Sequence, residues 1–129
     1  MKSIFLYLLL MICTACQSSL TPEQYDYGDE FDLAIGEKTR IGDNRISVEF
    51  VDVLEDSRCP SNANCIWAGN GKVQLKVQNH DIILNTYLEP HDTTITNIHV
   101  ELLNLAPYPE YPRQFEKDDY YIRLLITKK

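Results

Sequence analysis

Two of the four cysteines in this sequence lie close enough together to do chemistry as a pair. Cys59 and Cys65 enclose a segment of Pro, Ser, Asn and Ala, which is the composition of a turn. Paired thiols can form a disulfide, hold a zinc ion or exchange electrons with a partner. The spacing excludes a CxxC redox motif, and two thiolates without a nearby histidine make a poor tetrahedral zinc site. The compartment of the protein therefore decides whether the pair is bridged.

The N-terminal residues predict export from the cytoplasm. Met1-Lys2-Ser3 is a short basic start, and residues 4–12 (IFLYLLLMI) form an uninterrupted apolar run. This run is too short to cross a bilayer as a helix, which needs about 20 residues. Its length is that of the apolar region of a secretory signal peptide.

The segment Cys13-Thr14-Ala15-Cys16 resembles the lipobox of bacterial lipoproteins. The resemblance implies cleavage after Ala15 and attachment of acyl chains such as palmitate to Cys16. Cys13 is the weaker acceptor because the residue before it, Ile12, is bulky. An ordinary signal cut near Ala15 or a retained membrane anchor are the alternatives. Gln17 is not the Asp that retains many lipoproteins at the inner membrane, so the resemblance implies an outer-membrane destination in the bacterial cell envelope.

Export places the remaining cysteines in an oxidising compartment, where paired thiols usually bridge. We therefore predict a Cys59–Cys65 disulfide, which stabilises the fold by about 2.4 kcal/mol on the chain-entropy formula. The chain has 12 basic and 19 acidic residues and a formal charge of −7, and loss of Lys2 with the signal peptide makes the mature charge −8. Such an acidic chain is a poor nucleic-acid binder. We expect it to be repelled by anionic headgroups and to stand off the membrane to which it is anchored.

Short runs of alternating apolar and polar residues predict an all-β fold. The expected strands lie at residues 31–35, 46–53, 73–77, 82–88, 94–105 and 120–126. Turns are expected at residues 42–44, 69–71, 79–81 and 89–92. The alternation slips between Phe50 and Val51, which predicts a β-bulge there. The pattern indicates an antiparallel β-sandwich or small barrel of about six to eight strands with one disulfide-closed loop.

The same pattern predicts a single folded domain. Residues 1–15 form the lipoprotein signal peptide, residues 16–30 the acylated cysteine and a flexible tether, and residues 31–129 the β-domain. The segment 106–112 (APYPEYP) contains three prolines and cannot be a central strand. It is expected to be an extended crossover or a cover for a sheet edge.

The most distinctive stretch surrounds the cysteine pair. Asp56-Ser57-Arg58-Cys59-Pro60, followed by four residues and then Cys65-Ile66-Trp67-Ala68-Gly69, resembles a DSRCP-x4-CxWAG motif of uncharacterised small exported bacterial proteins and lipoproteins. The resemblance extends over most of residues 31–127. It implies a related fold and identifies no catalytic residue.

The motif has a structural and a recognition interpretation. In the structural one, Trp67 packs in the core beside the disulfide, Arg58 pairs with Asp56 or Glu55, and Gly69 and Gly71 allow the turn into the next strand. In the other, the closed loop is a rigid recognition edge. Its candidate contact residues are Arg58, Pro60, Ser61, Asn62, Asn64 and Trp67.

Other candidate residues do not form a recognisable site. His80 and His91 lie in expected turns at opposite ends of one strand, and His99 is expected on a solvent-facing strand position. The carboxylates of residues 26–32 lack EF-hand spacing, and no serine or free thiol has a nucleophilic context. Numerous tyrosines suit either an interface or edge packing, among them Tyr25, Tyr27, Tyr108, Tyr111, Tyr120 and Tyr121.

These observations favour a membrane-anchored, non-enzymatic exported lipoprotein that is an envelope binding or structural module of unknown ligand, with an envelope protein as a candidate partner. No metal, cofactor or nucleic acid is expected. One alternative is a protease-inhibitor-like domain that presents the 59–65 loop, since a rigid loop loses little entropy on binding. The other is an enzyme whose polar residues converge only in the folded protein.

Overall fold

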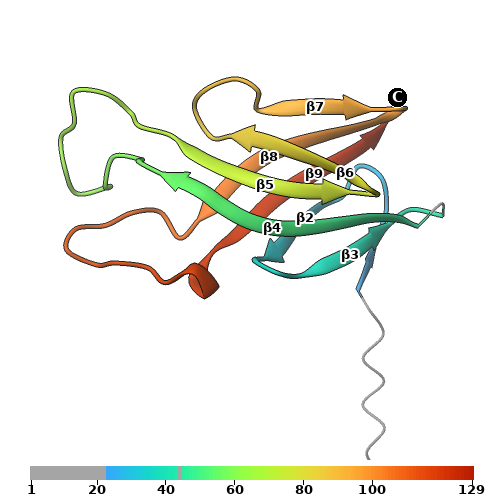
Figure 1. The fold of residues 1–129 in the computed structure, drawn as a ribbon, viewed down its shortest axis with the longest axis horizontal. Coiled ribbons are helices and arrows are strands. Elements are labelled where there is room, and N and C mark those ends of the chain that lie inside the picture. Colours follow the sequence, from blue (N-terminus) through green and yellow to red (C-terminus); the bar gives the residue numbers. More distant parts are fainter. Residues whose placement is uncertain (1–22, 44) are drawn as a thin grey trace, which may run out of the picture.

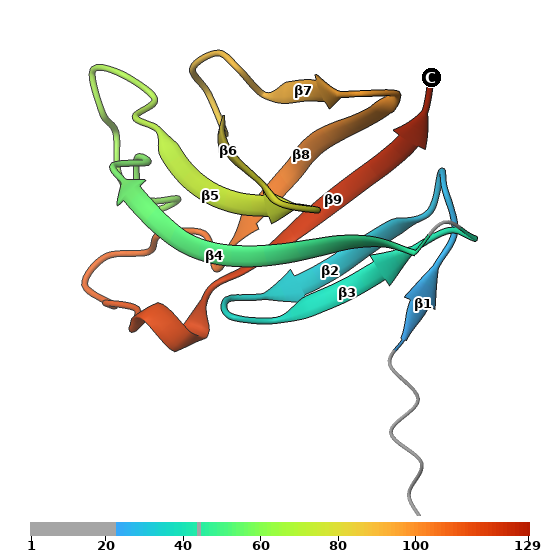
Figure 2. The same cartoon turned by 45° about the vertical axis from the view of Figure 1, so that its right-hand side comes forward.

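The structure, a computed structural model, describes residues 23–43 and 45–129. Within them, nine β-strands form two sheets that pack face to face and do not close into a barrel (Figures 1 and 2). The predicted all-β fold is confirmed, and the sandwich is the alternative that holds. The signal peptide and the lipidation site, Cys16, lie outside the described residues.

The first sheet has five strands in the order β1-β3-β4-β5-β6. These are β1 (Gln24–Tyr25), β3 (Lys38–Ile41), β4 (Ile46–Asp56), β5 (Gly71–Val77) and β6 (His80–Asn85). The second sheet has four strands in the order β2-β9-β8-β7. These are β2 (Glu30–Ala34), β9 (Tyr121–Lys128), β8 (Ile98–Ala106) and β7 (Asp92–Ile95). Neighbouring strands are antiparallel, except that β1 runs parallel to β3.

The core lies between the sheets and is built from the alternating apolar residues that the sequence displays. Along β5 every second residue is buried, and the inner face of β9 is buried in the same way. The largest fully buried side chains are Phe50, Ile41, Leu75, Leu84, Leu105, Ile122, Leu124 and Ile126. A single 3-10 turn, η1 (Lys117–Asp119), precedes β9. No helix among the described residues is long and apolar enough to span a membrane.

The predicted bulge in β4 is present, because the register against β5 shifts between Phe50 and Asp52. A second shift follows between Val53 and Glu55. Bulges bend a strand and increase its twist, which is consistent with the strong curve of β4 in Figure 2. The end of β4 that leads into the Cys59–Cys65 loop is therefore bent relative to the start of the strand.

Two turns lie elsewhere than predicted. The hairpin between β5 and β6 turns at Gln78 and Asn79, so His80 is the first residue of β6 and pairs with Val77. The expected strand at 94–105 is in fact the hairpin of β7 and β8, which turns at residues 96–97. Thr96 has a positive φ of 57°, an uncommon conformation for a β-branched residue that the alternation did not indicate.

Part of the expected tether belongs to the fold. Tyr25 in β1 stacks on Phe31 with ring centroids 4.7 Å apart, and the backbone N–H of Gly28 donates to the carbonyl of Ile126. The ammonium of Lys128 lies 5.9 Å from the ring of Tyr27. These contacts hold residues 24–30 against the sandwich, so the domain begins earlier than residue 31.

The two ends of the sandwich contain different parts of the chain. Figures 1 and 2 place β1 at one end, and the connections that follow β4 and β8 at the opposite end. The segment from Ser57 to Asn70, which contains the disulfide, and the proline-rich segment after Ala106 both belong to this opposite end. We call it the disulfide end.

Candidate functional site

A buried arginine joins the segments that meet at the disulfide end. The Nε and Nη2 of Arg58 donate to the carboxylate of Asp56 at 2.7 and 2.8 Å. The same guanidinium donates through Nη1 to the carbonyl of Leu105 and through Nη2 to that of Pro107, the latter at 2.8 Å. Tyr120 completes the arrangement by donating its hydroxyl to Asp56 at 2.9 Å. We call these five residues the Arg58 clamp.

The clamp is largely shielded from water, with side-chain exposures of 5% for Arg58 and 10% for Asp56. Burial alone raises the pKa of the Asp56 carboxyl, but the hydrogen bonds and charge of Arg58 and the hydroxyl of Tyr120 outweigh burial and hold that pKa below its ordinary value. Burial and the neighbouring Asp56 carboxylate raise the pKa of Tyr120 to about 12. The predicted pairing of Arg58 with Asp56 is therefore confirmed, and Arg58 faces inward rather than toward a partner.

Gly69 allows two chain segments to cross closely beside the clamp. Its φ is +71°, and a Cβ at this position would lie 1.8 Å from the carbonyl oxygen of Ser57. The two segments pair through Ser57 N–H to the carbonyl of Asn70 and Cys59 N–H to that of Ala68. The disulfide loop therefore leaves the sandwich from a narrow, fixed base.

A pair of buried asparagines positions the segment that follows β6. The Nδ2 of Asn70 donates to the Oδ1 of Asn85 at 2.9 Å. The Oδ1 of Asn70 accepts the backbone N–H groups of Tyr87 and Leu88 at 3.2 and 3.3 Å. Buried amides satisfied in this way rigidify their surroundings. Their effect here is to present the side chains of Tyr87 and Leu88 outward, since both are exposed.

A bulge in β8 places two further side chains at the same end. The register against β9 shifts between Leu102 and Asn104, so Leu103 is the extra residue. Leu102 and Leu105 are both buried, whereas Leu103 and Asn104 face outward. The sequence contains a signal for this bulge. The buried apolar residues up to Leu102 are two positions apart, whereas the next one, Leu105, follows after three positions.

The predicted disulfide between Cys59 and Cys65 is confirmed, with a Cα–Cα distance of 5.9 Å. The loop that it closes leans on the proline-rich segment. Asn62 donates from Nδ2 to the carbonyl of Tyr111 at 2.7 Å and accepts the Tyr111 N–H at 2.9 Å. The backbone N–H of Ser61 donates to the carbonyl of Pro109. Two predicted recognition residues, Ser61 and Asn62, thus anchor the loop.

The prediction that Trp67 packs in the core is wrong, because its side chain is 73% exposed. The neighbouring Ile66 is 94% exposed, and Asn64 is also exposed, whereas Pro60 is half-buried. The physical reason lies in the clamp. The guanidinium of Arg58 occupies the interior beside the loop base, and the ring of Tyr108 lies against it at 5.0 Å. The chain from Cys65 to Ala68 therefore runs over the outside.

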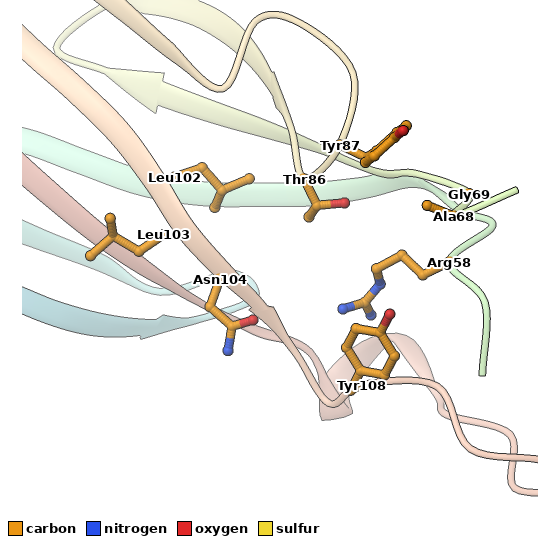
Figure 3. A pocket seen from close by; sticks show the side chains of 9 residues that line it. All are labelled: Arg58, Ala68, Gly69, Thr86, Tyr87, Leu102, Leu103, Asn104 and Tyr108. Carbon is orange, nitrogen blue, oxygen red and sulfur yellow. The ribbon is translucent and has the colours of Figure 1, made fainter. Parts of the chain in front are cut away.

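Two hollows lie side by side among these residues. The first encloses about 240 Å³ and is shown in Figure 3, where Arg58 enters between Tyr87 and Tyr108. Its lining residues are Arg58, Ala68, Gly69, Thr86, Tyr87, Leu102, Leu103, Asn104 and Tyr108. The second encloses about 230 Å³ and is lined by Glu55, Ser57, Trp67, Gly69, Asn70, Tyr87 and Leu88. The shared Gly69 and Tyr87 form the border between them.

The three histidines do not converge. His80 begins β6, whereas His91 Nδ1 lies 3.0 Å from the carbonyl oxygen of Asn85 at the other end of that strand. His99 is half-buried in β8, where its Nδ1 lies 3.2 Å from Thr94 Oγ1. Within residues 23–43 and 45–129, no group of three or more His, Cys, Asp or Glu side chains is arranged to hold a metal ion.

Comparisons with protein-family models, with curated proteins and with solved structures found no match to this chain. The interpretation of the disulfide end therefore depends on its own geometry. Sequence analysis identified Arg58, Trp67 and Tyr108 as candidates, but missed Tyr87, Leu88 and Asn104. Tyr87 and Leu88 follow β6, and Asn104 lies in the β8 bulge. These two segments come close to residues 56–69 only in the folded protein.

Gly69→Ala is expected to destabilise the domain by more than about 3 kcal/mol, because the new methyl group would overlap the Ser57 carbonyl in a strained backbone conformation. Gly36→Ala is the matched control, since Gly36 also has a positive φ, of 82°, but has no atom within 4 Å of the built Cβ. It is expected to lose only about 1–2 kcal/mol. Urea unfolding measures both values, and equal losses would contradict the close crossing at Gly69.

Asp56→Asn is expected to lower the free energy of unfolding by about 3–5 kcal/mol at neutral pH, because it leaves the buried guanidinium without its counter-charge. The difference from the wild type is expected to shrink as the pH falls below about 4. Folding lowers the pKa of Asp56, so its stabilisation is present at higher pH and is lost as the wild-type carboxylate protonates. Urea unfolding from neutral to acidic pH tests this expectation. A difference that stays constant over this range contradicts it.

Proposed function

We propose that the protein is a lipid-anchored, exported binding module of the bacterial cell envelope that performs no catalytic step. The observation that supports binding is the cluster of exposed aromatic side chains at the disulfide end. Trp67, Tyr87 and Tyr108 are 73%, 62% and 53% exposed, and each borders one or both hollows. Large aromatic side chains on a rigid base are the usual anchors of recognition surfaces.

The backbone beneath these rings is held in place before any partner arrives. The Arg58 clamp, the Gly69 crossing and the Asn70–Asn85 pair each fix one of the segments involved. A preorganised surface loses little conformational entropy on binding. A purely structural role for the disulfide end does not require the apolar rings to remain in water, so binding is the better account of their exposure.

Strand β1, the first strand after the proposed anchor in the sequence, lies at the end of the sandwich opposite to the disulfide end. Cys16 precedes Gln24, the first residue of β1, by eight positions, which reach at most about 29 Å. Strand β4 then runs from the β1 end toward the disulfide end over 11 residues, up to about 36 Å. The acidic mature chain is repelled by anionic headgroups. Lipidation at Cys16 would therefore direct the aromatic rings away from the bilayer.

The alternatives are less well supported by the same geometry. A protease inhibitor of the expected kind presents residues 60–64, but the side chain of Asn62 is turned to the backbone of Tyr111. Of the apolar side chains exposed beyond the disulfide, Ile66 and Trp67, the latter lines the second hollow. An enzyme requires reactive groups that converge on a substrate. The buried charges of the clamp, Arg58 and Asp56, are instead paired with each other.

Cys16→Ser is expected to abolish incorporation of a fatty-acid analogue and to release the protein from the membrane fraction, because the acyl acceptor is lost. Cys13→Ser is the control and is expected to be labelled like the wild type. Metabolic labelling and membrane sedimentation measure the two effects. Retention of label in Cys16→Ser with loss in Cys13→Ser would place the acyl chains on the other cysteine.

A photo-crosslinking residue at Ile66 is expected to form higher-mass adducts in intact cells, because this position is 94% exposed beside the aromatic cluster. The matched control is Ile83 in β6, an exposed isoleucine away from the two hollows. Gel mobility after irradiation and cell lysis measures the adducts. Equal labelling at both positions, or none at Ile66, argues against a binding surface at the disulfide end.

A further inference from the structure

The two hollows at the disulfide end share Gly69 and Tyr87, so they form adjacent subsites on one surface. Trp67 borders one subsite, Tyr108 borders the other, and Tyr87 stands between them. At about 240 and 230 Å³ they are smaller than the roughly 300–1,000 Å³ pockets that enclose drug-sized ligands. The geometry fits a chain-like ligand that places one ring-sized unit in each subsite.

The charge of the first hollow indicates an uncharged ligand. Arg58 is the only charged residue in its lining, and its guanidinium already forms an ion pair with Asp56. In the second hollow, the carboxylate of Glu55 lies 3.5 Å from the ammonium of Lys72. Neither hollow offers a free cation for an anionic group, and the chain as a whole is acidic.

The polar groups of the surface indicate a ligand rich in hydroxyls. Asn104, Tyr87 and Tyr108 all line the first hollow and are exposed, so the amide and the two phenol hydroxyls are open to a ligand. An amide offers both donors and acceptors, and a phenol offers one donor and an acceptor. Figure 3 shows Asn104 and Tyr108 among the side chains that line the first hollow.

From these three features we propose that the disulfide end binds a neutral oligosaccharide. The apolar C–H face of a sugar ring packs on an aromatic ring, while its hydroxyls exchange hydrogen bonds with the amide and the phenols. Two consecutive sugar units occupy the two hollows, one on either side of Tyr87. This inference rests on the proposed binding function and specifies its ligand. A flat protein partner would bury the rings without filling the two hollows that lie on either side of Tyr87.

The test uses the full lipoprotein, purified in a detergent without a sugar headgroup, and three neutral tetrasaccharides. The tetramer of β-1,4-linked N-acetylglucosamine represents glycans with acetamido groups, whereas cellotetraose and maltotetraose represent β- and α-linked glucans without them. Saturation-transfer NMR detects the bound sugar, and the fluorescence of Trp67, the only tryptophan, gives the affinity. We expect saturable binding of at least one tetrasaccharide, with a shift of Trp67 emission to shorter wavelength.

The variants locate the site. Tyr108→Ala and Asn104→Ala are each expected to weaken binding at least about tenfold, and Trp67→Ala to do the same by NMR. Thermal melting is expected to stay unchanged in Asn104→Ala and Trp67→Ala, whose side chains are exposed, and to fall slightly in Tyr108→Ala, whose ring lies against Arg58. Ile83→Ala is the matched control and is expected to bind like the wild type. Binding that is unaffected by the three site variants would overturn the assignment to these hollows.

The result also separates this inference from the function on which it rests. If none of the tetrasaccharides binds up to about 10 mM while Ile66 still forms adducts in cells, the saccharide inference is wrong and the surface binds a protein. If neither binding nor adducts are found, both proposals are wrong. Selective binding of the N-acetylglucosamine tetramer identifies a ligand recognised through its acetamido groups, and selective binding of a glucan identifies one recognised through its hydroxyls alone.

Discussion

The ion pair between Arg58 and Asp56 is the interaction on which the disulfide end depends. A guanidinium has five donors in one plane, and this one forms four hydrogen bonds that join the end of β4 to carbonyls near the end of β8 and just after it. Tyr120 extends the connection to the start of β9 through Asp56. Burying a charged pair costs desolvation free energy, and apolar side chains at the same positions can stabilise a protein equally well. An apolar side chain, however, could not direct three strand ends toward one another.

The consequences of this pair extend to the surface. Because the guanidinium fills the interior, the indole of Trp67 lies outside and the ring of Tyr108 stacks against the arginine. The guanidinium also lines the first hollow. Because its positive charge is balanced by the carboxylate of Asp56, it adds no net charge to this hollow. A change at one buried residue would therefore alter the packing, the shape and the electrostatics of the exposed end together.

The sequence predicted the fold well because the sandwich depends on a local pattern. Alternation along residues such as Val73, Leu75 and Val77 identifies a half-buried strand without knowledge of its partners. Strand β3 was missed because Lys38 and Arg40 alternate with only one strongly apolar residue, Ile41. The site was predicted only in part. Whether a tryptophan is inside or outside depends on what else fills the space, and Arg58 and Tyr108 are distant from each other in sequence.

The opposite placement of β1, where the described chain begins, and the aromatic cluster has a mechanical consequence. A membrane that holds the N-terminus and a fixed partner at the disulfide end would stretch the protein along its strands. The hydrogen bonds between β2 and β9, which pair over five residues, would share this load in shear rather than break one by one. The two-residue β1 would yield first, and the Cys59–Cys65 bond would prevent the loop from being drawn out at the other end. In such an arrangement the two ends would yield or hold separately, while the core strands of the two sheets kept their pairing.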